Sequence, residues 1–196
     1  MKHTTVTGNP LNIIVIVAAL GYFVDIYDLI LFSIVRIPSL KSLGITDPEL
    51  IKSTGIHLLN MQMIGMLTGG ILWGILGDKK GRLGVLFMTI FLYSVANIAN
   101  GFVQTVEQYS ILRFIAGVGL AGELGIGITL VSEVMTKETR GYGTTIVSGI
   151  GICGAVLGFL VADLFDWRMA YFVGGGLGLV LWSCVFRFMN PGCFLN

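Results

Sequence analysis

The chain has 196 residues, of which 55% are hydrophobic and only 12% are charged. An ordinary soluble protein has about 45–50% apolar and about 25% charged residues, so this chain carries too few charges to cover a surface exposed to water. The same composition excludes intrinsic disorder, and the net charge of +1 excludes a nucleic-acid-binding protein with a basic surface. The sequence is that of an integral membrane protein.

Six apolar stretches are long enough to cross a bilayer as helices, which takes about 17–25 residues. Each stretch is continuously apolar rather than alternating, which argues against a β-barrel. We therefore predict an all-α fold, with one transmembrane domain over residues 1–196. The six predicted helices cover residues 12–35, 57–76, 83–100, 109–132, 145–162 and 167–186.

The basic residues indicate an orientation, because Lys and Arg are enriched in cytoplasmic loops. The short connections GDKKGR (77–82) and TKETRG (136–141) are the basic ones. Both termini are therefore predicted to be cytoplasmic. The longest connection, residues 36–56, then lies outside, and Pro38 and Pro48 predict that it has little regular structure.

Glycine is frequent, with 28 residues, and several glycines form GxxxG pairs within the predicted helices. Small residues let helix backbones approach closely in lipid, where packing replaces the hydrophobic effect as the driving force. We predict close helix packing at these pairs, with direct substrate contact as the alternative. The pairs are Gly65 with Gly69, Gly70 with Gly74, Gly154 with Gly158, and Gly174 with Gly178.

Four charged residues fall inside the predicted helices: Asp25, Asp28, Arg113 and Glu123. A charge at the centre of a membrane helix costs roughly 2.5–3.5 kcal/mol, so each one needs an explanation. Asp25 and Asp28 are three residues apart and face the same side of their helix. Two carboxylates this close, in a medium of low dielectric constant, resist being ionised together. We predict that the four groups line one aqueous cavity; the alternative is that Arg113 pairs with an acid and locks the helices together.

Three polar residues near these charges are further candidates for the lining of the cavity. They are Tyr22, Tyr27 and Gln62. Packing between helices is the alternative role for each of them.

Two segments combine closely spaced glycines with charged residues. Residues 74–82, GILGDKKGR, resemble the signature loop of a family of transporters, the major facilitator superfamily, G-x-x-x-D-[RK]-x-G-R-[RK], with Leu83 in the final basic position. Residues 113–123, RFIAGVGLAGE, resemble its second motif R-F-x-x-G-x-G-x-G-G-E, with Ala121 in place of a glycine. The resemblance covers nearly the whole chain, but only the N-terminal six-helix half of a usual twelve-helix member.

Two further features extend the resemblance. Glu133 is followed by Arg140 and Gly141, as in the superfamily's loop between helices four and five. Residues 25–29, DIYDL, are similar to the D-[GA]-Y-D-x stretch of proton symporters for phosphate, aromatic acids and related metabolites, with Ile26 at the small position.

The resemblance implies secondary active transport of a small polar or anionic metabolite, with proton symport. Asp25, Asp28 and Glu123 are then candidate proton sites, and Arg113 is a candidate anchor for a negative substrate or for Glu123. A facilitator or antiporter for an organic solute, and a non-transporting membrane scaffold or sensor, are the alternatives.

The resemblance also implies a gate on the cytoplasmic face. Its members are Gly77, Asp78, Gly81, Arg82, Glu133 and Arg140. The charges among them would form a cluster that holds when the carrier opens outward. Ordinary basic loops would explain the lysines here, but not the acids or the paired glycines.

The partners expected are the lipid bilayer, a small-molecule substrate and H+. A cavity between two halves also requires either a second six-helix half or a parallel homodimer. We expect a multi-pass protein of the inner (plasma) membrane. The sequence indicates no catalytic residue, no cofactor and no metal site, because the cysteine spacing fits no metal pattern and His3 and His57 lie at a terminus and at a span edge.

Overall fold

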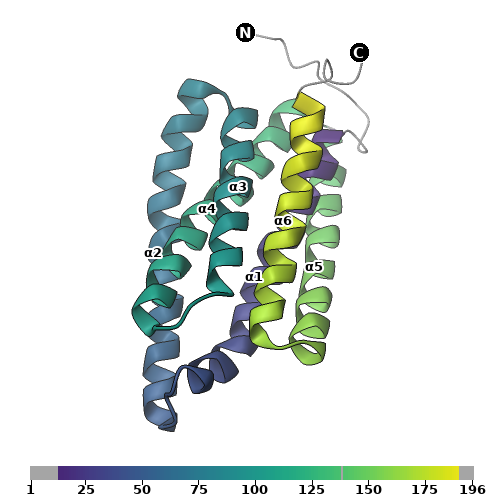
Figure 1. Ribbon diagram of the computed structural model, residues 1–196. Helices are drawn as coiled ribbons and strands as arrows, with labels where there is room; N and C mark the ends of the chain where they lie inside the picture. The colour runs from purple at the N-terminus through teal and green to yellow at the C-terminus, as the bar shows by residue number, and fades with distance from the viewer. Residues whose placement is uncertain (1–12, 138, 190–196) are drawn as a thin grey trace, which may run out of the picture.

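A computed structural model describes residues 13–137 and 139–189, and in that part of the chain six helices follow one another (Figure 1). Their number and type confirm the predicted all-α fold. The helices are α1 (Ile13–Ser42), α2 (Pro48–Lys80), α3 (Arg82–Asn100), α4 (Val106–Val134), α5 (Arg140–Leu164) and α6 (Trp167–Met189).

The helices are suited to a bilayer. Among the described residues, four helical segments are long and apolar enough to cross a membrane, and a fifth apolar segment, Gly84–Asn100, is shorter. Large apolar side chains face outward, as in Leu67 of α2 and Val180 of α6, which are 68% and 62% exposed. The fold is therefore that of a polytopic membrane protein.

Most predicted helices are shorter than the observed ones. Each predicted range lies within a helix, except for Asn12, which is outside the described residues. Helices α1, α2, α4 and α5 extend several residues beyond the apolar stretch and α3 and α6 by three or fewer, because the terminal backbone groups can be satisfied by polar groups and water. An apolar stretch therefore marks only the central part of each helix.

The prediction of an irregular loop over residues 36–56 is wrong. Helix α1 continues to Ser42 with Pro38 inside it, and α2 already begins at Pro48. Proline fits the first position of a helix, and the Asp47 carboxylate caps α2 by accepting a 3.0 Å hydrogen bond from the backbone N–H of Glu49. A proline within a helix bends it rather than ending it when the flanking turns are held by packing.

Two helix pairs make the closest packing in the bundle. Helix α2 lies along α4, and α1 lies along α5 (Figure 1). The two pairs are equivalent if the first three helices are exchanged with the last three, which is the relation that an inverted repeat requires. The start of α1 and the end of α6 lie at the same end of the bundle (Figure 1).

Glycines allow the helices of both pairs, α2 with α4 and α1 with α5, to approach each other closely. A Cβ atom on Gly69 would lie 2.6 Å from the carbonyl oxygen of Val118, and one on Gly158 would lie 2.9 Å from that of Tyr27. Gly70 and Gly74 differ, since nothing lies within 4 Å of their Cβ positions. Thus the GxxxG pair Gly65 and Gly69 packs against α4, whereas the pair Gly70 and Gly74 packs against nothing in the described structure.

Candidate functional site

A buried ion pair joins the middle of α1 to α4. The Arg113 guanidinium donates from Nη2 to Oδ2 of Asp28 at 2.9 Å and from Nη1 to Oδ1 at 3.3 Å. Both side chains are completely buried. Two parallel hydrogen bonds between a guanidinium and a carboxylate fix orientation as well as charge, so this pair has one defined geometry.

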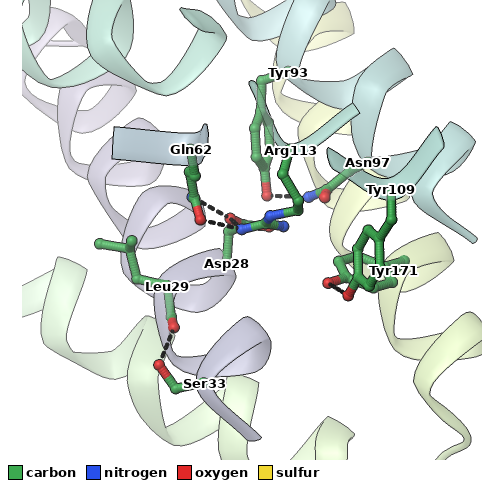
Figure 2. Close-up of polar contacts among 9 residues, drawn as sticks. All are labelled: Asp28, Leu29, Ser33, Gln62, Tyr93, Asn97, Tyr109, Arg113 and Tyr171. Atoms are coloured by element: carbon green, nitrogen blue, oxygen red, sulfur yellow. Dashed lines mark hydrogen bonds and ion pairs between the residues drawn. The ribbon is translucent and has the colours of Figure 1, made fainter. Parts of the chain in front are cut away.

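Gln62 of α2 completes the pair as a third member. Its Nε2 donates to Oδ2 of Asp28 at 3.1 Å, and its Oε1 accepts a hydrogen bond from Nη2 of Arg113. Figure 2 shows the three side chains converging from their separate helices. A single amide can serve both charged groups because it carries a donor and an acceptor.

The close approach of α2 and α4 places Gln62 beside Arg113. A Cβ on Gly117 would overlap the carbonyl oxygen of Gln62, and a Cβ on Gly65 would overlap that of Phe114. Gly65, which the sequence marks as a packing residue, and Gly117 therefore allow the helices to approach one helical turn away from Gln62 and Arg113.

Aromatic rings enclose the guanidinium. Its Cζ lies 4.2 Å from the ring centroid of Phe32 and 5.9 Å from that of Tyr171. The Tyr171 hydroxyl is 2.5 Å from that of Tyr109, and the Phe32 and Tyr109 rings meet edge to face. Such ring faces attract a cation and exclude water from it.

Sequence analysis missed these aromatic residues. Phe32 follows Asp28 by four residues and Tyr109 precedes Arg113 by four, so helical spacing places each beside its charged neighbour and could have found both. Tyr171 lies on α6, and no local signal connects it with Arg113.

Asp25 and Glu123 form a contrasting part of the site. Both are buried, with 4% and 3% of their surface exposed, and none of their four carboxyl oxygens has a hydrogen-bond partner within the described residues. Glu123 reaches toward α1, where its Oε2 lies 3.6 Å from the Cβ position of Gly21. The two acids are close enough to repel each other when both are charged.

Arg113 pairs with Asp28 rather than with Glu123, which is one of the two partners predicted for it, and its role as an anchor for a negative substrate stays a prediction. Glu123 is ten residues further along α4, which corresponds to about 15 Å at 1.5 Å per residue. Helix α1 crosses α4 so that Asp28 is the acid at the level of Arg113.

The two tyrosines of α1 pack between helices. Tyr27 is buried, and its hydroxyl donates a 2.8 Å hydrogen bond to the carbonyl oxygen of Ala170 in α6. Tyr22 is half-buried, and its ring lies over Gly151 of α5. Neither residue contacts the Asp28–Arg113 pair through a hydrogen bond, which agrees with the packing alternative.

Four of the six predicted gate residues, Gly77, Asp78, Gly81 and Arg82, lie where α2 ends and α3 begins. Gly81 has φ +93°, a conformation that L side chains rarely adopt, and its N–H bonds the carbonyl oxygen of Gly77 to end the helix. The Arg82 guanidinium is 3.4 Å from the Asp78 carboxylate, in an exposed pair. Arg140 begins α5 and is exposed, and the side chain of Glu133 lies outside the described residues, so their part in the gate stays a prediction.

The site offers ionisable groups and hydrogen bonds rather than a metal centre. In the described ranges, no three His, Cys, Asp or Glu residues gather in a group that could hold a metal ion. The arrangement can hold one carboxylate against a buried guanidinium, and in this structure that carboxylate is Asp28.

Comparison with known proteins places the chain among transporters. A model of the Major Facilitator Superfamily matches residues 14–192. The benzoate transport protein of Acinetobacter baylyi is 32% identical over 171 residues, which are 83% of this chain and 36% of that protein. The niacin transporter NiaP of the same organism is 30% identical over 163 residues, 81% of this chain and 36% of that protein. The chain thus spans 36% of the length of each of these two relatives.

Solved structures share the fold. A partially occluded, inward-open structure of the xylose transporter XylE from E. coli matches with a TM-score of 0.77 at 19% identity. The match covers 91% of this chain and 51% of that one. The six helices therefore correspond to about half of a complete carrier.

Proposed function

Because the chain belongs to the Major Facilitator Superfamily, we propose that it acts as half of a secondary active transporter that moves a small anionic metabolite together with a proton. The relatives named above carry benzoate and niacin, which are small acids. A monocarboxylate of this size is the cargo that we infer for the complete carrier.

The observation that carries this proposal is the buried Asp28–Arg113 pair with Gln62 beside it. A carboxylate already occupies the guanidinium in the geometry in which Arg binds carboxylates. A cargo carboxylate can take that place only if the Asp28 carboxylate loses its charge.

Protonation of Asp28 supplies that change. A neutral carboxyl no longer neutralises Arg113, which cannot lose its own proton and therefore attracts another anion. Gln62 keeps a hydrogen bond to Arg113 during the exchange through its carbonyl oxygen. Proton and anion then bind in sequence to the same pair, which couples their movement.

Asp25 and Glu123 extend the proton route. Both are buried without a hydrogen-bond donor among the described residues, and we propose that each takes up and passes on a proton when water reaches it. We place them between Asp28 and the cytoplasm, because α4 runs from outside to inside in the orientation proposed from the basic loops. In this orientation both termini are cytoplasmic and the membrane is the plasma membrane.

The complete carrier needs a second wall for its cavity. A second six-helix half supplies it, or a parallel homodimer does, since the cavity in such carriers lies between two halves related by an axis along the membrane normal. The residues at the end of α2, with Asp78 and Arg82, close the cytoplasmic side in the outward-open state.

Uptake into proteoliposomes tests the proposal. Under an inward proton gradient we expect purified protein to accumulate labelled benzoate, and Asp28→Asn to lower the rate about tenfold or more, the effect of losing one charge-assisted hydrogen bond. Asp163→Asn is the matched control, because Asp163 is an exposed acid on α5. Uptake by Asp28→Asn at the wild-type rate and with the wild-type pH dependence would contradict the proton assignment.

A non-transporting scaffold or sensor is the second candidate, and one observation favours it. The Asp28–Arg113 pair is fully buried and closed by Gln62, as in a structural lock. Protein that binds no acid and shows no uptake, while retaining a folded bundle, would support this alternative. A facilitator or antiporter would show uptake without dependence on a proton gradient of this direction.

A further inference from the structure

A cavity far from the buried ion pair lies between the last turns of α1 and the first turns of α2. Its volume is about 450 Å³. Three basic side chains line it, those of Arg36, Lys41 and Lys52, and its apolar wall includes Ile37 and Ile56. A basic rim and an apolar wall are thus combined in one cavity.

The sequence builds this cavity through two prolines. Pro38 lies inside α1, and the final turns of α1 bend toward the start of α2 (Figure 1). Pro48 begins α2 directly after a short turn, so the two helix ends remain close together. The bend places Arg36 and Lys41, on either side of Pro38, around the same space.

The charges of the three basic groups are not neutralised by any acid in the described part of the chain. Arg36, Lys41 and Lys52 form no ion pair with any described residue. The Asp47 carboxylate is engaged at the N-terminus of α2, where it accepts the N–H of Glu49. The stem of Arg36 packs on Gly55, with its Cδ 3.6 Å from the Cβ position of that glycine.

The position of these charges calls for an explanation. The basic loops at the opposite end of the bundle follow the usual enrichment of Lys and Arg on the cytoplasmic side. In the orientation proposed above, the outer side of the membrane is where that enrichment is not expected. The side chains of Arg36, Lys41 and Lys52 lie on this side and surround a single cavity. Orientation in the membrane therefore does not account for them, whereas binding of an anion does.

We propose that this cavity binds an oxyanion carried on an apolar body. The Arg36 guanidinium and the two ammonium groups bind the oxyanion, and the isoleucine wall receives the hydrocarbon part. A free organic carboxylate and the phosphate end of an anionic lipid share this chemistry. The site is separate from Asp28 and Arg113, and it stands whether or not the chain transports.

Acylation of lysines tests the site in the unmodified protein. The protein is placed in nanodiscs of phosphatidylcholine and treated briefly with an amine-reactive reagent, with and without benzoate, and modification is read by mass spectrometry. When benzoate occupies the cavity in most of the molecules, Lys41 and Lys52 are expected to react about fourfold more slowly, because only molecules with an empty cavity react. Lys79 and Lys80, exposed at the opposite end of the bundle, are controls within the same molecule.

Three comparisons make the test specific. Benzamide, which has the same ring but no charge, is expected to protect neither Lys41 nor Lys52. Arg36→Gln is expected to require about tenfold more benzoate for the same protection, since it removes one charge-assisted hydrogen bond. The triple variant Lys79→Gln, Lys80→Gln and Lys137→Gln is expected to leave the protection unchanged.

Nanodiscs containing phosphatidylglycerol separate the two sources of the anion. If the lipid is the occupant, Lys41 and Lys52 are protected there without benzoate, and added benzoate changes nothing. If the occupant is a free acid, protection still requires benzoate. Reaction of Lys41 and Lys52 at the same rate under all these conditions, or equal protection in Arg36→Gln, overturns the proposal.

Discussion

Helices α1 and α4 contribute two pairs of ionisable groups. All four side chains are buried, but the pairs differ in charge and in hydrogen bonding. Asp28 and Arg113 neutralise each other and share the amide of Gln62. Asp25 and Glu123 have the same charge, and their carboxyl oxygens have no hydrogen-bond partner among the described residues. One pair is therefore a defined contact between helices, whereas the other brings two acids of like charge into the bundle without a hydrogen-bond partner among the described residues.

This difference gives the two pairs different roles in the proposed transport cycle. In the proposed transport cycle, a proton on Asp28 frees Arg113 for another anion. Asp25 and Glu123 have no hydrogen-bond partner among the described residues that a proton would release. The comparison predicts opposite consequences for stability when the two pairs are altered.

Breaking the ion pair from the acidic side is expected to have the largest effect. Asp28→Leu leaves an uncompensated guanidinium in the bundle and is expected to lower the free energy of unfolding by about 3–5 kcal/mol. Arg113→Leu is expected to cost less, because the carboxyl of Asp28 can take up a proton whereas a guanidinium cannot lose one. Denaturant unfolding in detergent micelles measures both.

The double variant sharpens this prediction. Asp28→Leu with Arg113→Leu removes both charges, and we expect it to recover most of the stability lost in Asp28→Leu. Equal losses in the two single variants, or a double variant no more stable than Asp28→Leu, would contradict the account of the pair.

Separating α2 from α4 is expected to have the next largest effect. Gly117→Ala places a methyl group against the carbonyl oxygen of Gln62 and is expected to destabilise the bundle by about 1–3 kcal/mol, the usual cost of overpacking. Gly70→Ala is the matched control, since nothing lies within 4 Å of its Cβ position. Thermal unfolding midpoints of the two variants decide the matter, and similar midpoints would show that the glycine contact is not required.

Neutralising the unpaired acids is expected to have a small effect of the opposite sign. Asp25→Asn and Glu123→Gln remove no hydrogen bond that the described structure contains, so each is expected to change the free energy of unfolding by less than about 1 kcal/mol, with a gain in the double variant. The same unfolding assay provides the measurement. A loss as large as that in Asp28→Leu would mean that these acids have partners after all.

The exposed pair at the end of α2 is expected to matter least for stability. Asp78→Asn is expected to cost about 0.2–1 kcal/mol, the usual contribution of an exposed ion pair, because Asp78 lies in the last turn of α2 and Arg82 begins α3. High salt is expected to remove the difference between wild type and variant, because exposed charges are screened. A loss that persists in high salt would indicate that Asp78 has a further role in this conformation.

Much of the site could be predicted from the charged and polar residues within the apolar stretches. Asp28, Arg113 and Gln62 all stand out in the sequence because polar groups within apolar stretches need an explanation. Their partners could not be read in the same way. The spacing along α4 gives the distance from Arg113 to Glu123, but not which residue of α1 faces Arg113.

The sequence by itself determined that the chain lies in a bilayer and that it is helical. Apolar runs of sufficient length must form helices in a bilayer, because only then are their backbone N–H and C=O groups hydrogen-bonded. The sequence also indicated where helices can approach closely, because small residues such as glycine permit such contact, although only some of its glycine pairs make one. The tertiary structure alone decided which acid is neutralised and that the ends of α1 and α2 enclose a basic cavity. The reason is physical: pairing depends on how two helices are rotated and shifted against each other, and packing with residues distant in the chain fixes both.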